Sequence, residues 1–176
     1  MRIDVDSRIQ YPREVVYNAY RDHLPDLIPY LPNMKAIEVL ERKEDGNKVT
    51  FKNLWTAKTE IPKAAQSILK PEMMTWFDHA TWDNATFTNV WRTEMRALTD
   101  AVDCHGGNSF EEVGPNSTLL RLRGELNLDL KKVPGVPRLL AGTIGPVIEK
   151  FVVAMLKPNL EETARGLEKY LAAQKK

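Results

Sequence analysis

The C-terminal segment, residues 138–175, constrains the fold more than any other part of the sequence. Its apolar residues recur every three or four positions, which places them on one face of a long α-helix. Most charged residues of the segment fall on the other faces. Because a series of strands precedes this helix, we expect a curved sheet with the helix laid against it. The apolar stripe consists of Leu140, Ile144, Val147, Ile148, Phe151, Met155, Leu160, Leu167 and Leu171.

The upstream sequence has the alternation of apolar and polar residues that is typical of strands with one buried face. The clearest case runs from Leu120 to Leu130, with leucines on one face and charged or polar residues on the other. Gly124 lies at the centre of the apolar face, where the strand can bend or a helix can approach closely. Residues 44–47 are a hairpin turn signal. Further strands are predicted at residues 3–10, 34–42, 48–58, 73–82, 86–98 and 102–113, the last weakened or bulged at Gly106 and Gly107.

Prolines mark the helices. The first short helix should begin near Pro12, whose missing N–H is harmless in a first turn. A second, around residues 24–31, is made irregular by three prolines. Residues 59–70 fit either a short helix or a bulged strand. Pro158 should divide the terminal helix into two limbs, with the second starting near Asn159, so that it marks a place where the first limb could hinge as a lid.

Composition limits the classes of function. At 176 residues, with 43% hydrophobic and 28% charged residues and no internal repeat, the chain fits one domain that spans residues 1–176. A net charge of +1 gives no general attraction to nucleic acid. No apolar run is long and uncharged enough to cross a bilayer, although residues 133–140 could touch a membrane transiently instead of packing over the sheet. The N-terminus lacks the apolar core of a signal peptide, and the single cysteine fits a reducing compartment, so a cytoplasmic protein is expected. The sequence does not indicate the oligomeric state.

The sequence predicts neither a metal site nor a cofactor. Its three histidines, His23, His79 and His105, lack the close spacing of metal ligands, and Cys104 and His105 should point to opposite faces of a strand. There is no Gly-x-Ser-x-Gly motif and no phosphate-binding glycine loop.

Two neighbouring residues, Asp78 and His79, are the candidates for general acid–base catalysis. They lie beside Trp76 and Phe77 in a predicted strand, which turns one of them to each face. Periodicity leaves open which of the two faces the interior. Because no catalytic partner is evident in the sequence, the alternative is that one is solvated and the other makes a local hydrogen bond.

Large aromatic residues fall on successive predicted strands, with Asn53, Asn89 and Thr93 among them. Such a wall suits a pocket that binds an apolar body and orients a few polar atoms, although core packing alone would also explain it. Asn53, if buried, needs a partner or a water. The residues expected to bind a ligand are Phe51, Asn53, Trp55, Phe87, Asn89, Trp91, Met95, Leu122 and Leu126 of the sheet and Ile144, Ile148, Phe151 and Met155 of the terminal helix.

The order of elements resembles the START-related (SRPBCC) superfamily, which includes polyketide cyclases, birch-pollen-allergen-like proteins, lipid-transfer START domains and coenzyme-Q-binding proteins. The resemblance rests on residues 9–17, Ile-Gln-Tyr-Pro-Arg-Glu-Val-Val-Tyr, on residues 22–32, on the hairpin segments 39–43 and 49–51, and on the terminal helix. It implies an α+β helix-grip fold across the chain. In this fold a curved antiparallel sheet of about six or seven strands wraps around a long C-terminal helix, two short helices follow the first strand, and a pocket for an apolar ligand lies between sheet and helix.

Three functions are compatible with these features, because the fold does not decide function. The favoured one is non-catalytic binding or transport of a hydrophobic small molecule such as a lipid, an isoprenoid or an aromatic polyketide. The second is a cyclase- or hydrolase-type enzyme that uses His79 or Asp78 as its acid or base. The third is a protein-interaction module with a filled core.

Overall fold

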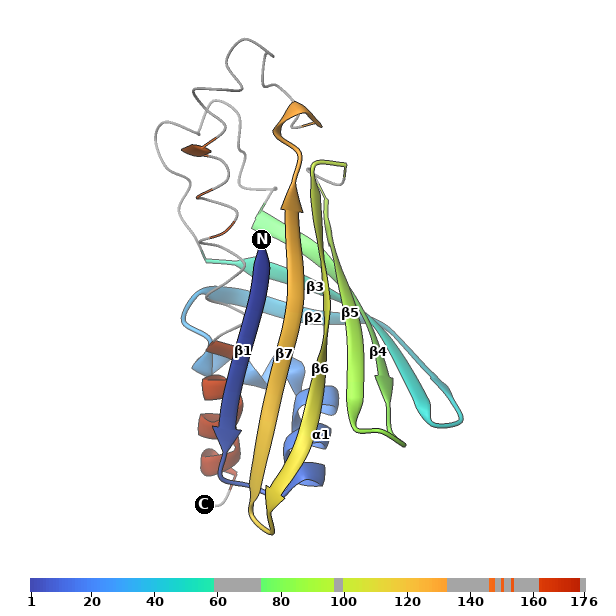
Figure 1. The fold of residues 1–176 in the computed structure, drawn as a ribbon, viewed down its shortest axis with the longest axis vertical. Helices are drawn as coiled ribbons and strands as arrows, with labels where there is room; N and C mark the ends of the chain where they lie inside the picture. The colour runs from blue at the N-terminus through green and yellow to red at the C-terminus, as the bar shows by residue number, and fades with distance from the viewer. Residues whose placement is uncertain are drawn as a thin grey trace.

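The computed structural model places a seven-stranded antiparallel sheet on one side of the molecule and helices on the other (Figure 1). It describes residues 1–58, 74–96, 100–132, 146–147, 150, 153 and 162–174. The strands follow one another across the sheet in the order β1-β7-β6-β5-β4-β3-β2, so all neighbours except β1 and β7 are consecutive in the chain. They are β1 (Arg2–Ile9), β2 (Met34–Asp45), β3 (Lys48–Ala57), β4 (Thr75–Asp83), β5 (Thr88–Met95), β6 (Val102–Gly114) and β7 (Ser117–Leu128).

The helices lie against one face of this sheet, called the inner face below. Helix α1 (Arg13–Asp22) begins directly after Pro12, as predicted, and buries Val16, Tyr17, Ala19 and Tyr20. It is followed by the 3-10 helix η1 (Leu24–Tyr30). A short 3-10 turn, η4 (Leu130–Lys132), follows β7. Near the C-terminus residues 162–173 are helical, and they lie on the same side of the sheet as α1 (Figure 1). The predicted fold, a sheet that grips a terminal helix with two short helices after the first strand, is confirmed.

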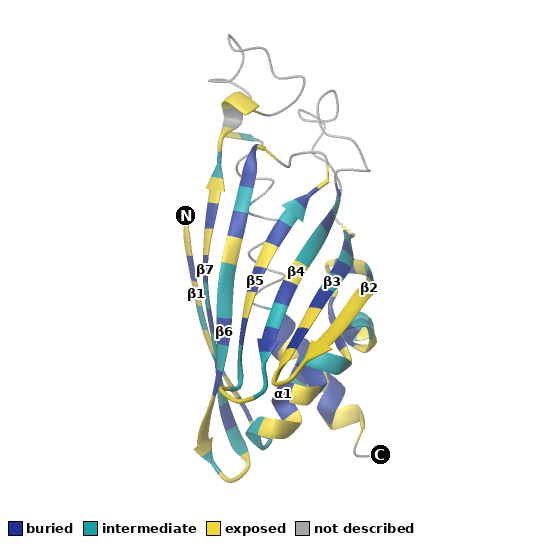
Figure 2. Ribbon diagram, turned by 90° about the vertical axis from the view of Figure 1, so that its right-hand side faces the viewer, coloured by how far each residue is buried: buried dark blue, intermediate teal, exposed yellow. Residues whose placement is uncertain are grey.

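Burial alternates along the strands as the sequence predicts, and Figure 2 shows this as alternating bands on β3 to β7. The inner face carries the apolar core, which includes Phe51, Trp55, Trp91, Leu122 and Leu126. The opposite, outer face carries mostly charged and polar residues. Strand β2 forms one edge of the sheet and is exposed along most of its length.

The predicted bulge at Gly106 and Gly107 is wrong. The pairing of β6 with both neighbours runs without a shift through these glycines, and the only irregularity between β6 and β7 lies between Glu112 and Gly114. Gly106 and Gly124 instead make room for an indole, whereas a Cβ atom on Gly107 would lie 2.8 Å from the backbone oxygen of Asn89. Trp91, Gly106 and Gly124 are direct cross-strand neighbours, and a Cβ atom on Gly106 would lie 2.6 Å from Cζ2 of Trp91. On Gly124 it would lie 3.0 Å from Cη2 of the same ring. The close neighbour of Gly124 is therefore the Trp91 ring from β5 of the same sheet, and not a helix as expected.

The strand predicted at residues 86–98 is shorter than expected, because β5 starts only at Thr88. Phe87 belongs to the preceding turn and has a φ of +54°, a backbone conformation that side chains with a Cβ rarely adopt. Its ring packs edge-on against Tyr17, with a centroid separation of 5.2 Å, and lies 4.1 Å from the guanidinium carbon of Arg13. These contacts hold Phe87 in its strained conformation.

Several expectations concern residues outside those described. They are the ambiguous segment 59–70, the division of the terminal helix at Pro158, and most of the first limb of that helix. Of the apolar stripe, Leu167 and Leu171 are buried, and Val147 packs against the core. No helix in the described parts of the chain combines the length and apolar character that a membrane span requires.

Candidate functional site

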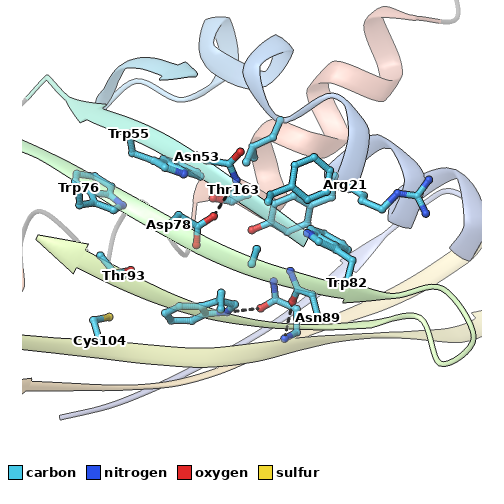
Figure 3. Close-up of a pocket in the computed structure, with 16 residues that line it drawn as sticks. Arg21, Asn53, Trp55, Trp76, Asp78, Trp82, Asn89, Thr93, Cys104 and Thr163 are labelled. Atoms are coloured by element: carbon cyan, nitrogen blue, oxygen red, sulfur yellow. Dashed lines mark hydrogen bonds between the residues drawn. The ribbon is translucent and has the colours of Figure 1, made fainter. Parts of the chain in front are cut away.

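A cavity lies between the inner face of the sheet and the helices that cover it (Figure 3). Its empty space is about 690 Å³, which includes the part open to solvent. Helix α1, η1, four neighbouring strands and the C-terminal helix all contribute to its wall. The lining residues are Tyr20, Arg21, Leu24, Phe51, Asn53, Trp55, Trp76, Asp78, Ala80, Trp82, Asn89, Trp91, Thr93, Cys104, Asn108 and Thr163.

Tryptophans form much of the wall. Trp55 and Trp76 are cross-strand neighbours, and their rings stack with centroids 6.0 Å apart and planes 15° from parallel. Trp82 packs edge-on against Tyr20 of α1, with centroids 5.3 Å apart. The indole of Trp91 lies over Gly106 and Gly124. Flat rings on several sides make a cavity that suits a flat, mostly apolar molecule.

A row of polar side chains crosses this aromatic wall, and we call it the polar row. It consists of Asn53, Asp78, Thr93 and Cys104, which are direct neighbours on β3, β4, β5 and β6. All four side chains lie on the inner face, because residues directly opposite one another on neighbouring strands point to the same face of a sheet. The amide Nδ2 of Asn53 donates a hydrogen bond of 3.1 Å to Oδ2 of Asp78. Burial raises the pKa of the Cys104 thiol to about 12, so this side chain is neutral.

Asp78 is the central member of the polar row. It lies deep in the molecule, yet its side chain keeps some accessible surface because it faces the cavity. Burial raises its pKa to about 6, and the hydrogen bond from Asn53 and the charge of His79 only partly oppose this shift. The cause is desolvation, which disfavours the charged form of a carboxyl group.

Two buried polar atoms beside Asp78 are unpaired. Oδ1 of Asn53 has no hydrogen-bond partner among the described residues, although Nδ2 of the same amide donates to Asp78. The indole N–H of Trp55 lies close enough to lower the pKa of Asp78 slightly, but it reaches no acceptor in the described structure with hydrogen-bond geometry. A buried polar atom without a partner typically costs about 1–3 kcal/mol, so a bound molecule that pairs with these atoms would gain affinity from them.

A second set of polar side chains lies further along the cavity, and most of its hydrogen-bonding atoms have partners. Oδ1 of Asn89 accepts a 3.0 Å hydrogen bond from the backbone N–H of Asn108, and Oδ1 of Asn108 accepts one of 3.4 Å from the Trp91 indole. Burial raises the pKa of the Tyr20 hydroxyl, while hydrogen bonding to Thr163 and Asn108 opposes that rise. Tyr20 is therefore neutral at physiological pH. These groups fix the wall rather than offer free atoms.

Arg21 is the only arginine or lysine among the described lining residues, and its charge is already paired. Its Nη2 lies 2.6 Å from Oδ2 of Asp22, and its Nη1 donates a 2.6 Å hydrogen bond to Oδ1 of Asn84. In Figure 3 its guanidinium points away from Asp78. Arg42 also contacts Asp22, at 3.0 Å. This cluster anchors α1 to the sheet and does not neutralise Asp78.

The structure places the two acid–base candidates on opposite faces of β4. Asp78 faces the cavity, while His79 is exposed on the outer face, where its Nε2 lies 2.9 Å from Oε2 of Glu94. The strand register explains this separation, because Asp78 is opposite the buried Asn53 and His79 is opposite Lys52. Asp78 is thus the candidate that a bound ligand can reach.

The predicted ligand-binding residues fall into three groups. Five line the cavity: Phe51, Asn53, Trp55, Asn89 and Trp91. Others do not reach it: Met95, Leu122 and Leu126 are buried in the surrounding core, and Phe87 lies in the turn after β4. The remaining four, Ile144, Ile148, Phe151 and Met155, are outside the described residues.

Several lining residues did not follow from the sequence. Tyr20 and Arg21 come from α1, and Thr163 from the C-terminal helix, so only the tertiary fold brings them to the cavity. Asn108 had a usable signal, because it shares the strand periodicity of Cys104 and Phe110. Within the described part of the chain, no three histidine, cysteine or carboxylate side chains gather as metal ligands would.

Comparison with known proteins identifies the fold. No family model matches the chain, and no curated protein matches its sequence. Among solved structures, a protein from Thermus thermophilus is 20% identical with a TM-score of 0.68 and 100% of both chains covered. The aromatase/cyclase Zhui from Streptomyces sp. R1128 is 13% identical with a TM-score of 0.70, covering 100% of this chain and 96% of that one. Norcoclaurine synthase from Thalictrum flavum is 14% identical with a TM-score of 0.59, covering 98% and 86%. The chain therefore shares the fold of these proteins, which is the helix-grip fold that its sequence predicts.

Proposed function

We propose that this protein binds a small, mostly apolar molecule in the cavity between its sheet and its helices. The observation that carries the proposal is the polar row in the aromatic wall. Asp78 carries a desolvated carboxyl group, and Asn53 and Trp55 each hold a buried polar atom without a partner in the described structure. Core packing alone gives no reason for these costs, whereas a ligand that pairs with the three groups would offset them.

The walls supply most of the expected affinity. Four tryptophans line the cavity, and the apolar surface that a ligand buries contributes about 25 cal/mol per Å² before the costs of association. The polar groups would then select among apolar candidates, because an ill-matched ligand leaves them unpaired. A flat ligand of one or two rings matches this division between apolar walls and a few polar contacts.

Structures with the same fold support a small aromatic ligand. Zhui is an aromatase/cyclase, and norcoclaurine synthase has been solved in complex with dopamine and hydroxybenzaldehyde. Identities of 13% and 14% carry the fold and not the reaction. We therefore take from these proteins only that a helix-grip fold can accommodate molecules of the size of dopamine and hydroxybenzaldehyde.

A second candidate function is proton transfer on the bound molecule, with Asp78 as the acid or base. A carboxyl group with a pKa of about 6 has appreciable populations of both protonation states near neutral pH, as a general acid–base catalyst requires. Its position in the cavity puts it within reach of a ligand. His79 does not serve this role, because it lies on the outer face of the sheet.

The direct test is ligand capture. We expect native mass spectrometry of protein expressed in cells, followed by calorimetric titration with small aromatic compounds, to detect one bound molecule per chain. Asp78→Asn should weaken or alter binding, whereas Asp103→Asn, the same change on the outer face, should not. If no compound binds and none co-purifies, the cavity is not a ligand site. A filled-core interaction module would give that result.

A further inference from the structure

The charge balance around Asp78 is unequal. A carboxyl group with a pKa of about 6 is about nine-tenths ionised at pH 7. The cavity therefore holds a negative charge that has lost much of its hydration. Buried charges in proteins are normally paired, since an isolated one is expensive.

No described residue supplies the missing positive charge inside the cavity. The groups that face Asp78 from β3, β5 and β6 are Asn53, Trp55, Thr93 and Cys104, and none of them is cationic. Tyr20 faces it from α1 and is neutral, because burial raises its pKa and the charge of Asp78 adds to that rise. His79 acts on Asp78 only from the outer face of the sheet. Arg21 is already engaged by Asp22 and Asn84.

The free hydrogen-bonding atoms next to this charge are mainly acceptors. Oδ1 of Asn53 is unpaired, and the carboxylate of Asp78 has more lone pairs than the single bond from Asn53 uses. An ammonium group offers three N–H donors and no acceptor, so it can pair with both oxygens at once. A hydroxyl offers one donor, and a carbonyl offers none. The Trp55 N–H is left for one acceptor atom elsewhere on the ligand.

The surrounding rings also favour a cation. Trp55 and Trp76 stack beside the polar row, and Trp91 lies in the next cross-strand row. The face of an indole carries a negative quadrupole, which attracts ammonium ions, most strongly where water is excluded. Aromatic rings around a carboxylate are thus a suitable environment for an organic cation.

We propose that the cavity selects an arylalkyl amine, whose ammonium group binds between the side chains of Asp78 and Asn53 while its aromatic body lies against the tryptophans. This inference rests on the proposed function, since it names the class of ligand for the same cavity. It requires no covalent step. The ligand supplies the positive charge that the described lining lacks.

The test compares matched pairs of an amine and the alcohol of the same shape: benzylamine with benzyl alcohol, phenethylamine with 2-phenylethanol, and naphthylmethylamine with naphthalenemethanol. Each is titrated into the full chain by calorimetry at pH 8 and at pH 5. At pH 8 the amine should bind about tenfold more tightly than its alcohol, the range expected for a hydrogen bond to a charged group. At pH 5 the preference should shrink severalfold, because Asp78 is mostly protonated. At pH 6, titrations in two buffers of different ionisation enthalpy should reveal release of about half a proton per bound amine.

Variants assign the effect to Asp78. Asp78→Asn should abolish the preference for the amine at pH 8 while the alcohol still binds, and Asp103→Asn on the outer face should keep it. The pH series on the unmodified chain gives the same information if Asp78→Asn does not fold. Equal binding of amine and alcohol at pH 8, or a preference that persists at pH 5 and in Asp78→Asn, would overturn the inference and leave the proposed function standing. If no pair binds at all, the inference fails, and the proposed function is then decided by the ligand capture described above.

Discussion

The two faces of strand β4 differ in how their charged side chains are paired. On the outer face the exposed His79 contacts Glu94 at 2.9 Å, and nearby the exposed Arg92 contacts Asp103 at 3.1 Å, with both carboxylates partly exposed to solvent. On the inner face Asp78, one residue before His79, lies in a desolvated cavity with no described cation beside it. Exposed ion pairs contribute little to stability, typically less than about 1 kcal/mol, whereas an unpaired buried charge is expensive. Only the inner charge therefore requires an explanation beyond solubility, and ligand binding supplies one.

The largest expected effect is a loss of stability when a side chain is added at Gly106, next to the Trp91 ring. A Cβ on Gly106 would lie 2.2 Å from the backbone oxygen of Arg123 and 2.6 Å from the Trp91 ring, so Gly106→Ala should destabilise the protein by about 3 kcal/mol. Chemical denaturation measures the change. Gly114→Ala is the control, since its Cβ would meet only ordinary contact at 3.6 Å. Equal effects of the two changes would mean that Trp91 does not lie over Gly106.

The next effect tests the cost of the inner charge. The pKa of Asp78 is raised from 3.8 to about 6, so the folded protein holds this proton more tightly than the unfolded chain does. The stability that the neutral carboxyl contributes is fully present below about pH 4 and is lost as the pH rises through 6. The amide that replaces the carboxyl group in the variant does not ionise, so Asp78→Asn avoids this loss. The free energy of unfolding of the variant minus that of the unmodified protein should therefore be about 2 kcal/mol larger at pH 8 than at pH 4.

Denaturation across this pH range measures that difference. Glu94→Gln, a matched change on the outer face, should show little such rise. A difference between Asp78→Asn and the unmodified protein that stays flat with pH would contradict a desolvated Asp78.

A smaller effect concerns the aromatic wall and its recognition of ligands. Trp55→Phe keeps a ring in place but loses contact area and the unpaired N–H, so it should weaken binding about fivefold. Phe77→Leu changes an aromatic residue on the outer face of the next strand, where the ring lies 4.5 Å from Nζ of Lys52. It should leave binding unchanged, as calorimetry can verify. Loss of binding in both variants would point to a general loss of structure.

The smallest effect is expected at His79. Its pair with Glu94 is exposed, so His79→Gln should change the free energy of unfolding by less than about 0.5 kcal/mol and leave ligand binding unchanged. Thermal unfolding and calorimetry test both points. A large loss of binding or of any turnover in this variant would return His79 to the site and contradict the division between the two faces.

Most of the sheet could be predicted from periodicity because its two faces differ in polarity. The need of Asn53 for a partner was also predictable, and Asp78 meets it for the amide nitrogen, at 3.1 Å, but not for Oδ1. Which of Asp78 and His79 faces inward was not, because alternation is symmetric until the register with β3 is known. Gly106 and Gly107 were misread because a glycine pair in a strand looks like a bulge until the strand's neighbours are seen, which are Trp91 for Gly106 and the backbone of Asn89 for Gly107. Tyr20, Arg21 and Thr163 reach the cavity through packing between distant elements, which local sequence patterns do not encode.

The protonation state of Asp78 is central to the proposed ligand site, and carboxyl-carbon NMR titration of that residue tests it most directly. Asp78→Asn assigns the signal, and Asp103 on the outer face serves as an internal comparison. We predict a pKa of about 6 for Asp78 in the empty protein, well above that of an ordinary aspartate. A pKa near 4 would mean that the carboxylate is solvated or paired, and it would contradict the unpaired charge on which the ligand proposal rests.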